Sequence, residues 1–193
     1  MKPLLLVALA SFSLAGGSGP LTHEQALDAA FPKQKMASQA HYWSKEERAH
    51  LATLAGVKKV KGTSTSWHVA PKEDLPPKDQ AKVGKQAWFD KRAVRSKAQD
   101  LMVIIDADGK VTKIVVCRFD EPQDYRPSQK WYDQFVGETL DDDLQIGKDI
   151  HAVSGATMTA RATTAAVREL LAADQVARHG VPKPKPVPAQ SQD

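Results

Sequence analysis

The sequence contains a single cysteine, Cys117, among its 193 residues. One cysteine cannot form an internal disulfide, so the stability of the folded chain has to come from packing. Cys117 stands within the apolar segment KIVVCRF, which predicts a buried and chemically inert core thiol.

Motifs of several enzyme and nucleic-acid-binding classes are also missing. The six histidines are scattered singly, without the two-histidine helical spacing of a zinc hydrolase, and no NAD fingerprint is present. The basic run KKVK at 58–61 has no interleaved aromatics, and the net charge is only +4. We interpret this run as a solvated face rather than a nucleic-acid site. The sequence therefore predicts no catalytic residue, no metal site and no nucleic-acid partner.

The apolar run from Leu4 to Ala15 is too short to cross a bilayer as a helix, which takes about 20 residues. It follows Lys2 and precedes small residues, the layout of a secretory signal peptide. We therefore expect residues 1–19 to be a signal peptide and the protein to be exported, periplasmic or otherwise extracytoplasmic. Residues 180–193 are proline-rich and polar, which predicts a disordered tail. The intervening residues 20–179 suffice for one domain.

Two capping boxes predict helices near the N-terminus. Thr22 and Gln25 begin a short helix, with the glutamine three residues after the cap. Ser44 and Glu47 repeat this pattern for a helix that ends at Gly56.

Strand signals follow in the middle of the chain. Strands are predicted over 57–69 and in VGKQAWFDKRAV, with a surface loop at the proline pair 76–77. The segment LMVIIDADGKVTKIVVCRF has two apolar runs joined by Asp-Gly, which predicts a hairpin. Asp106 and Asp108 belong to its turn, because the further ligands of a calcium loop are missing.

Two more helices complete the predicted fold. One is short, capped by Ser128 and closed by Gly137. The last helix has an apolar face formed by Ala162, Ala165, Ala166, Leu170, Ala173 and Val176. We predict an α+β domain with an antiparallel sheet built from hairpins, and with helices at the N-terminus, before the SGAT motif and after it.

The SGAT motif, Ser154 to Thr157, precedes the last helix in the stretch DIHAVSGATMTAR. Gly155 permits backbone angles that other residues avoid, and Ala156 adds little bulk. Thr157 or Thr159 can cap the helix. The free N–H groups of a helix start suit a phosphate, although a capped turn without a ligand has the same pattern.

This stretch resembles the covalent-FMN-binding domain family, whose signature is Ser or Thr, then Gly-Ala-Thr, one residue and Thr. The resemblance extends from about Thr22 to Val176 and includes VRSKAQDLMVIIDADGKV, FDEPQDYRP and the segment from Trp131 to Phe135. The family includes flavinylated subunits of the sodium-pumping NADH:quinone oxidoreductase and of the Rnf complex. The chain is most similar to its stand-alone exported members.

The resemblance implies that FMN is joined by a phosphoester bond to Thr157. A separate, Mg²⁺-dependent flavin transferase would make this bond from FAD. Ser154, Gly155, Ala156 and Thr159 would shape the pocket. His151 departs from the family, which usually has an acidic residue three positions before the Ser or Thr. That change affects transferase recognition or the charge near the phosphate.

The resemblance also assigns residues outside the motif. Arg95, Glu121 and Tyr125 match family blocks and are candidates to line the isoalloxazine ring or its ribityl chain. The alternatives are a turn shaped by Tyr125 and a surface ion pair for Arg95. Trp131 and Phe135 are four residues apart on a helix, a spacing that favours core packing over flavin stacking.

These features predict an exported flavoprotein that relays electrons between membrane-linked redox partners and an extracytoplasmic acceptor. Two other classes are weighed against it. Ser154 or Thr157 as a hydrolase nucleophile is disfavoured, because neither lies in a GxSxG elbow. A non-redox module that binds a phosphorylated ligand, or one that senses with its flavin, stays open.

Overall fold

The computed structural model describes residues 19–69, 84–141 and 143–182. In these residues five strands form one antiparallel sheet in chain order, from β1 to β5. The strands are β1 (Met36–Tyr42), β2 (Thr63–Val69), β3 (Gln86–Ala93), β4 (Ala98–Ile105) and β5 (Val111–Phe119). The predicted signal peptide (except Gly19), the predicted loop at the proline pair and most of the predicted tail lie outside the described residues.

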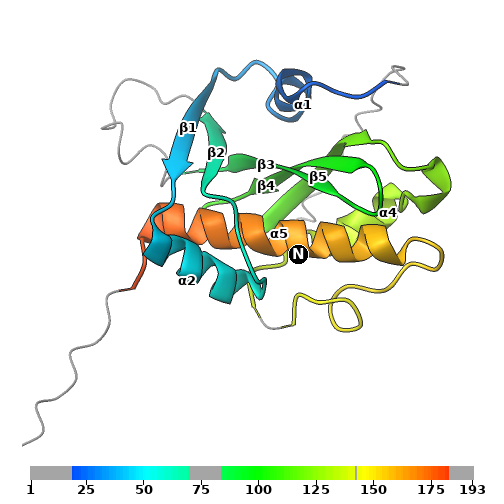
Figure 1. Ribbon diagram of the computed structural model, residues 1–193. Coiled ribbons are helices and arrows are strands. Elements are labelled where there is room, and N and C mark those ends of the chain that lie inside the picture. The colour runs from blue at the N-terminus through cyan, green and yellow to red at the C-terminus, as the bar shows by residue number, and fades with distance from the viewer. Residues whose placement is uncertain (1–18, 70–83, 142, 183–193) are drawn as a thin grey trace, which may run out of the picture.

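Helices cover both faces of this sheet, which confirms the α+β class (Figure 1). The long helix α5 (Thr157–His179) packs on one face, and α2 (Lys45–Ala55) packs against α5. Helix α1 (His23–Ala30) lies on the opposite face. The short α4 (Gln129–Tyr132) and two 3₁₀ turns, η1 (Gln123–Tyr125) and η2 (Asp133–Phe135), link β5 to the SGAT region.

Strand β4 lies at the centre of the core, and its residues from Leu101 to Ile105 are buried on both faces of the sheet. Leu101, Val103 and Ile105 join the cluster under α5, whereas Met102 and Ile104 join the cluster under α1. Burial on both faces explains why LMVII reads as a continuous apolar run rather than an alternating one. The predicted hairpin from β4 to β5 is confirmed, with the Asp106 carboxylate accepting turn N–H groups of Asp108 and Lys110.

Both predicted capping boxes are present. The hydroxyls of Thr22 and Ser44 accept the backbone N–H groups of Gln25 and Glu47. The side-chain oxygens of Gln25 and Glu47 in turn accept the backbone N–H groups of the two cap residues. Helix α2 ends at Gly56, as predicted, with a left-handed φ of 68°. Reciprocal capping satisfies N–H groups that a helix start otherwise leaves unpaired.

Three details of the sequence-based prediction are wrong. The strand expected over 57–69 begins only at Thr63, and β1 was not predicted at all, because most of MASQAHY is polar and exposed. The helix at Ser128 is a single α-turn continued by η2, and the Ser128 hydroxyl makes no capping bond within the described residues.

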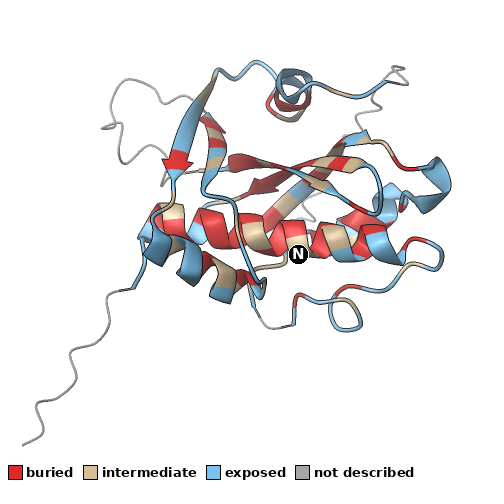
Figure 2. Cartoon of the chain, in the orientation of Figure 1, coloured by how far each residue is buried: buried red, intermediate tan, exposed pale blue. Residues whose placement is uncertain are grey.

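Helix α5 is buried on more than the one predicted face (Figure 2). The sheet covers one side of α5. Helix α2 and the connector, the segment between η2 and the SGAT motif, cover much of the rest. Arg168 on α5 is buried and donates to the carbonyls of Leu54 and Ala55 at the C-terminus of α2, and to that of Leu144. A cation at a helix C-terminus is favoured by the helix dipole. Arg168 therefore connects α5, α2 and the connector.

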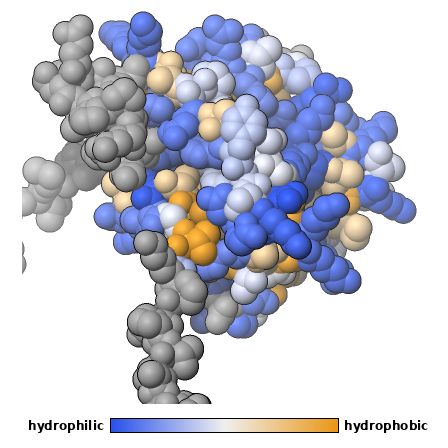
Figure 3. All heavy atoms as spheres, turned by 60° about the vertical axis from the view of Figure 1, so that its left-hand side comes forward, coloured by the Kyte–Doolittle hydropathy of each residue, from blue (hydrophilic) through white to orange (hydrophobic). Residues whose placement is uncertain are grey.

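The surface near β1 and α2 is mainly hydrophilic, with small separate apolar groups (Figure 3). In the part of the chain that the structure describes, no helix is both long and apolar enough to cross a membrane.

Candidate functional site

The SGAT motif forms the turn that leads into α5. Gly155 has a φ of +78°, and a Cβ placed there would meet no atom within 4 Å. The glycine is therefore required by its backbone conformation rather than by close packing. The prediction that Thr157 or Thr159 caps the helix is wrong. Ala156 occupies the N-cap position, and its methyl group cannot accept a hydrogen bond.

A cavity of about 160 Å³ lies beside this turn. Seven of the nine predicted site residues line it, although they come from three separate parts of the chain: Arg95, Glu121, Tyr125, Gly155, Ala156, Thr157 and Thr159. Val94 and Met158 complete the lining and were not predicted. Ser154 and His151 are exposed and are not among the lining residues.

The two threonines of the motif have different surroundings. Thr157 is the first residue of α5 and is exposed. Thr159 is 1% exposed, and its hydroxyl donates to the Tyr125 carbonyl at 2.7 Å. The Thr159 hydroxyl therefore connects α5 to η1, whereas Thr157 is open to a reagent from solvent.

Glu121 holds the loop that forms the opposite wall of the cavity. One carboxylate oxygen, Oε1, accepts the backbone N–H groups of Arg95, Ser96 and Lys97 at 2.7–3.2 Å. These bonds, led by that from Lys97, lower the pKa of Glu121. Glu121 is only 5% exposed. The three backbone N–H groups therefore stabilise its charge in place of water. Its role in the structure is to fix the wall that carries Val94 and Arg95.

Two residues that follow β5, Trp131 and Gln134, hold the segment that leads into the SGAT motif. The His151 N–H donates to Gln134 Oε1 at 2.8 Å, and the His151 carbonyl accepts from Trp131 Nε1 at 2.7 Å. The predicted core position of Trp131 and Phe135 is confirmed, since they are 6% and 0% exposed. Sequence reasoning found the ring of Trp131 but missed its N–H bond to the motif segment.

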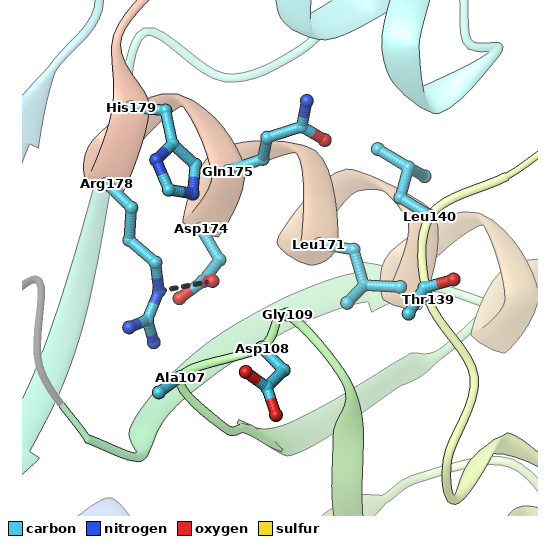
Figure 4. Close-up of a pocket in the computed structure, with 10 residues that line it drawn as sticks. All are labelled: Ala107, Asp108, Gly109, Thr139, Leu140, Leu171, Asp174, Gln175, Arg178 and His179. Carbon is cyan, nitrogen blue, oxygen red and sulfur yellow. Dashed lines mark hydrogen bonds and ion pairs between the residues drawn. The ribbon is translucent and has the colours of Figure 1, made fainter.

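A larger cavity of about 410 Å³ lies at the other end of α5 (Figure 4). Asp174 and Arg178 form its charged wall, with Arg178 Nε and Asp174 Oδ2 2.7 Å apart. Trp88 Nε1 also donates to Asp174, at 3.0 Å. Both partners of the Asp174 carboxylate are side chains of the protein, so this ion pair serves the fold. The cavity at the SGAT motif is therefore the better candidate for a ligand site.

The motif end of α5 combines an exposed threonine, a helix start without a side-chain cap and a cavity with apolar walls. These three features together suit a ligand that has a phosphate group and an aromatic ring system. Residues 96–172 match the family model described as FMN-binding domain, so this part of the chain is similar to the proteins of that family. The match includes β4, β5, the SGAT motif and most of α5. No curated protein matches the chain.

Proposed function

We propose that the protein is an exported electron-transfer flavoprotein whose FMN is joined by a phosphoester bond to Thr157. The observation that carries the proposal is the exposure of Thr157 at the start of α5, beside the cavity and within the segment that matches the FMN-binding domain. Thr159 is a poor alternative, because its hydroxyl is buried and already donates to Tyr125.

The attachment is a group transfer without a change of oxidation state. The Thr157 hydroxyl oxygen bonds to the FMN-side phosphorus of FAD, and the bond from that phosphorus to the bridging oxygen breaks. AMP leaves with the bridging oxygen, and the hydroxyl proton passes to solvent. A Mg²⁺-dependent flavin transferase is the partner that this step requires. The free N–H groups at the start of α5 would stabilise the phosphate charge.

The surrounding residues fit a flavin in kind. Val94, Met158 and Tyr125 offer apolar and aromatic surface for the ring, and Arg95 offers a cation at the rim. The protein contributes placement and electrostatics, while flavin supplies the redox chemistry. A covalent bond also keeps the site occupied outside the cell, where free FMN is too dilute to saturate it.

Electron relay is favoured over a self-contained enzyme, because the cavity lining has no His to serve as a general base and no nucleophile–base pair. Membrane electron-transport proteins are the proposed redox partners. A module that binds a phosphorylated ligand without redox chemistry, or that senses with its flavin, is the alternative.

The test is to co-express the protein with a flavin transferase in an exporting host and to measure the intact mass after denaturation. Protein that carries the FMN adduct is the expected result, whereas protein without it would contradict the proposal. Adding an electron-transport membrane fraction then separates the two functions. Bleaching of the flavin band supports electron relay, and an unchanged band under reducing conditions supports the alternative.

A further inference from the structure

The segment before the SGAT motif is held through the backbone of one residue. His151 donates its N–H to Gln134 and accepts a bond at its carbonyl from Trp131, so both of its peptide groups are fixed. Gln134 is itself oriented, because its Nε2 donates to the Trp131 carbonyl at 3.1 Å. We call these two side chains, Gln134 and Trp131, the backbone clamp.

The Trp131 ring of the backbone clamp belongs to the core, whereas Gln134 is half-buried and bonded to the Trp131 carbonyl. The Trp131 ring packs edge-on against Tyr132 and Phe135, with ring centroids 5.2 and 5.4 Å apart. Tyr132 and Phe135 are almost fully buried. Side chains locked by packing can hold a flexible partner in one geometry.

The segment that the clamp holds has little structure of its own. Residues 151–153 have no regular secondary structure, and the motif turn after them has one backbone bond, from Ala156 N–H to the Val153 carbonyl. His151, Ala152, Ser154, Gly155 and Thr157 are all exposed along it. An unrestrained loop of this kind would adopt many conformations, and only some would present Thr157 correctly.

We propose that Gln134 and Trp131 are positioning residues for flavin attachment. They fix the His151 backbone, so that the folded domain presents Thr157 to the flavin transferase in one conformation. This inference rests on the proposed function. It specifies that the transferase acts on the folded domain and that its contact surface includes the exposed residues of this segment, from His151 to Thr157.

The clamp holds the His151 backbone, not its side chain. With both peptide groups fixed, His151 lies at the surface and outside the cavity lining. Its side chain therefore faces an approaching protein rather than the cavity, and a change there acts on the rate of attachment rather than on the bound flavin.

The experiment follows attachment to purified, folded protein that was produced without the transferase. Transferase, FAD and Mg²⁺ are added, and the FMN adduct is measured against time by intact mass. Gln134→Ala removes the acceptor for the His151 N–H, and Trp131→Phe removes the donor but keeps a ring in the core. We expect each variant to lower the initial rate about tenfold, because small errors in placing a reacting group have large kinetic costs.

Two further variants separate positioning from folding. Gln134→Glu keeps an acceptor oxygen for the His151 N–H but loses the Nε2 donor to the Trp131 carbonyl, so it should restore only part of the rate lost in Gln134→Ala. Gln129→Ala is the matched control, because Gln129 lies in α4 but bonds to Asp133 and the Ile114 carbonyl instead of the motif segment. Thermal unfolding is measured for every variant. Once attachment is complete, each variant is expected to show the same flavin absorption spectrum as the wild type.

The outcomes distinguish this inference from the proposed function. Wild-type protein that never gains the adduct overturns the proposed function and, with it, the inference. Wild-type protein that gains the adduct while Gln134→Ala and Trp131→Phe match its rate overturns only the inference. An equally fast reaction of chemically unfolded wild-type protein overturns it as well. A slow rate in both clamp variants, with normal melting and partial rescue by Gln134→Glu, supports it.

Discussion

The two ends of α5 are built in opposite ways. At the N-terminal end the helix starts at Ala156 without a side-chain cap, and Thr157 is exposed beside a cavity. At the C-terminal end Asp174 and Arg178 are 1% and 6% exposed and are paired with each other. Arg178 also donates to the Gly84 carbonyl, and the Gly180 N–H closes the last turn on Val176.

This difference assigns separate tasks to one helix. The C-terminal end satisfies its polar groups within the protein, so it stabilises the fold. The N-terminal end leaves N–H groups and a hydroxyl available, so it can react. A helix held firmly at one end can keep the other end in place without filling its site. Variants at the two ends should therefore affect different properties.

The largest expected effect is loss of the flavin in Thr157→Ala. Removing the hydroxyl removes the atom that forms the ester, so the adduct should be absent, while thermal unfolding of the protein without flavin stays the same. Intact mass after co-expression with the transferase measures the adduct, and Thr157→Ser is the control that keeps a hydroxyl. An adduct retained by Thr157→Ala would move the attachment site elsewhere.

The next largest effect is a loss of stability in Asp174→Ala at the other end of the helix. The change leaves the Arg178 guanidinium buried without its carboxylate and removes the acceptor for Trp88 Nε1. Breaking a buried ion pair on one side costs about 3–5 kcal/mol of unfolding free energy. Denaturant unfolding measures this, with the exposed Asp143→Ala as control. The folded fraction should still accept flavin normally, and a lower attachment per folded molecule than in the wild type would contradict the division of tasks.

Thr159→Val tests the motif end without touching Thr157. The valine keeps the shape but removes the hydrogen bond to the Tyr125 carbonyl. Losing such a bond costs about 1 kcal/mol, with an upper range of about 3 kcal/mol for a buried group left unpaired. We expect this loss in denaturant unfolding and a normal mass adduct. Disappearance of the adduct in Thr159→Val, with Thr157→Ala still modified, would exchange the roles of the two threonines.

The smallest expected effect concerns pH. Burial lowers the pKa of His41, which stacks between Trp43 and Trp88, and lowers that of nearby His68. Below their ordinary pKa of about 6.5 the unfolded chain binds more protons than the folded one, so unfolding free energy falls as pH falls and is level above that value. Each group contributes at most about 1.4 kcal/mol per pH unit.

Thermal unfolding over this pH range measures the effect, and a His41→Gln, His68→Asn double variant should flatten it. Trp88 stacks on His41 and donates to Asp174, so His41 belongs to the stabilising end of α5. Flavin attachment should follow the transferase's own pH dependence in both proteins. Equal slopes in the wild type and the double variant would assign the pH response to other groups.

Much of the fold could be predicted because its signals are local. The capping boxes at Thr22 and Ser44 and the Asp-Gly hairpin depend on residues within a few positions of one another. Strand β1 could not be predicted from its own residues, because among the described strands it lies at the edge of the sheet, pairs with β2 alone and is mostly exposed. Its polar sequence lacks the alternation that burial of one face would produce.

The site shows the same limit. The resemblance identified most of the cavity lining, yet the roles within it depend on contacts between distant segments. Glu121 acts on the backbone of residues 95–97, and the Thr159 hydroxyl pairs with Tyr125 rather than capping the helix. The bond from Trp131 to His151 joins residues 20 positions apart. Local patterns carry no signal for such pairs.

Cys117 is also suited to a practical use. It is 2% exposed, and burial together with the charge of Asp100 raises the pKa of its thiol to about 12. A thiol of this kind reacts with alkylating reagents only when the core around it opens. As the sole cysteine in the sequence, it lets the labelling rate of the natural protein report core opening. Comparing that rate before and after flavin attachment would show whether the occupied site tightens the fold.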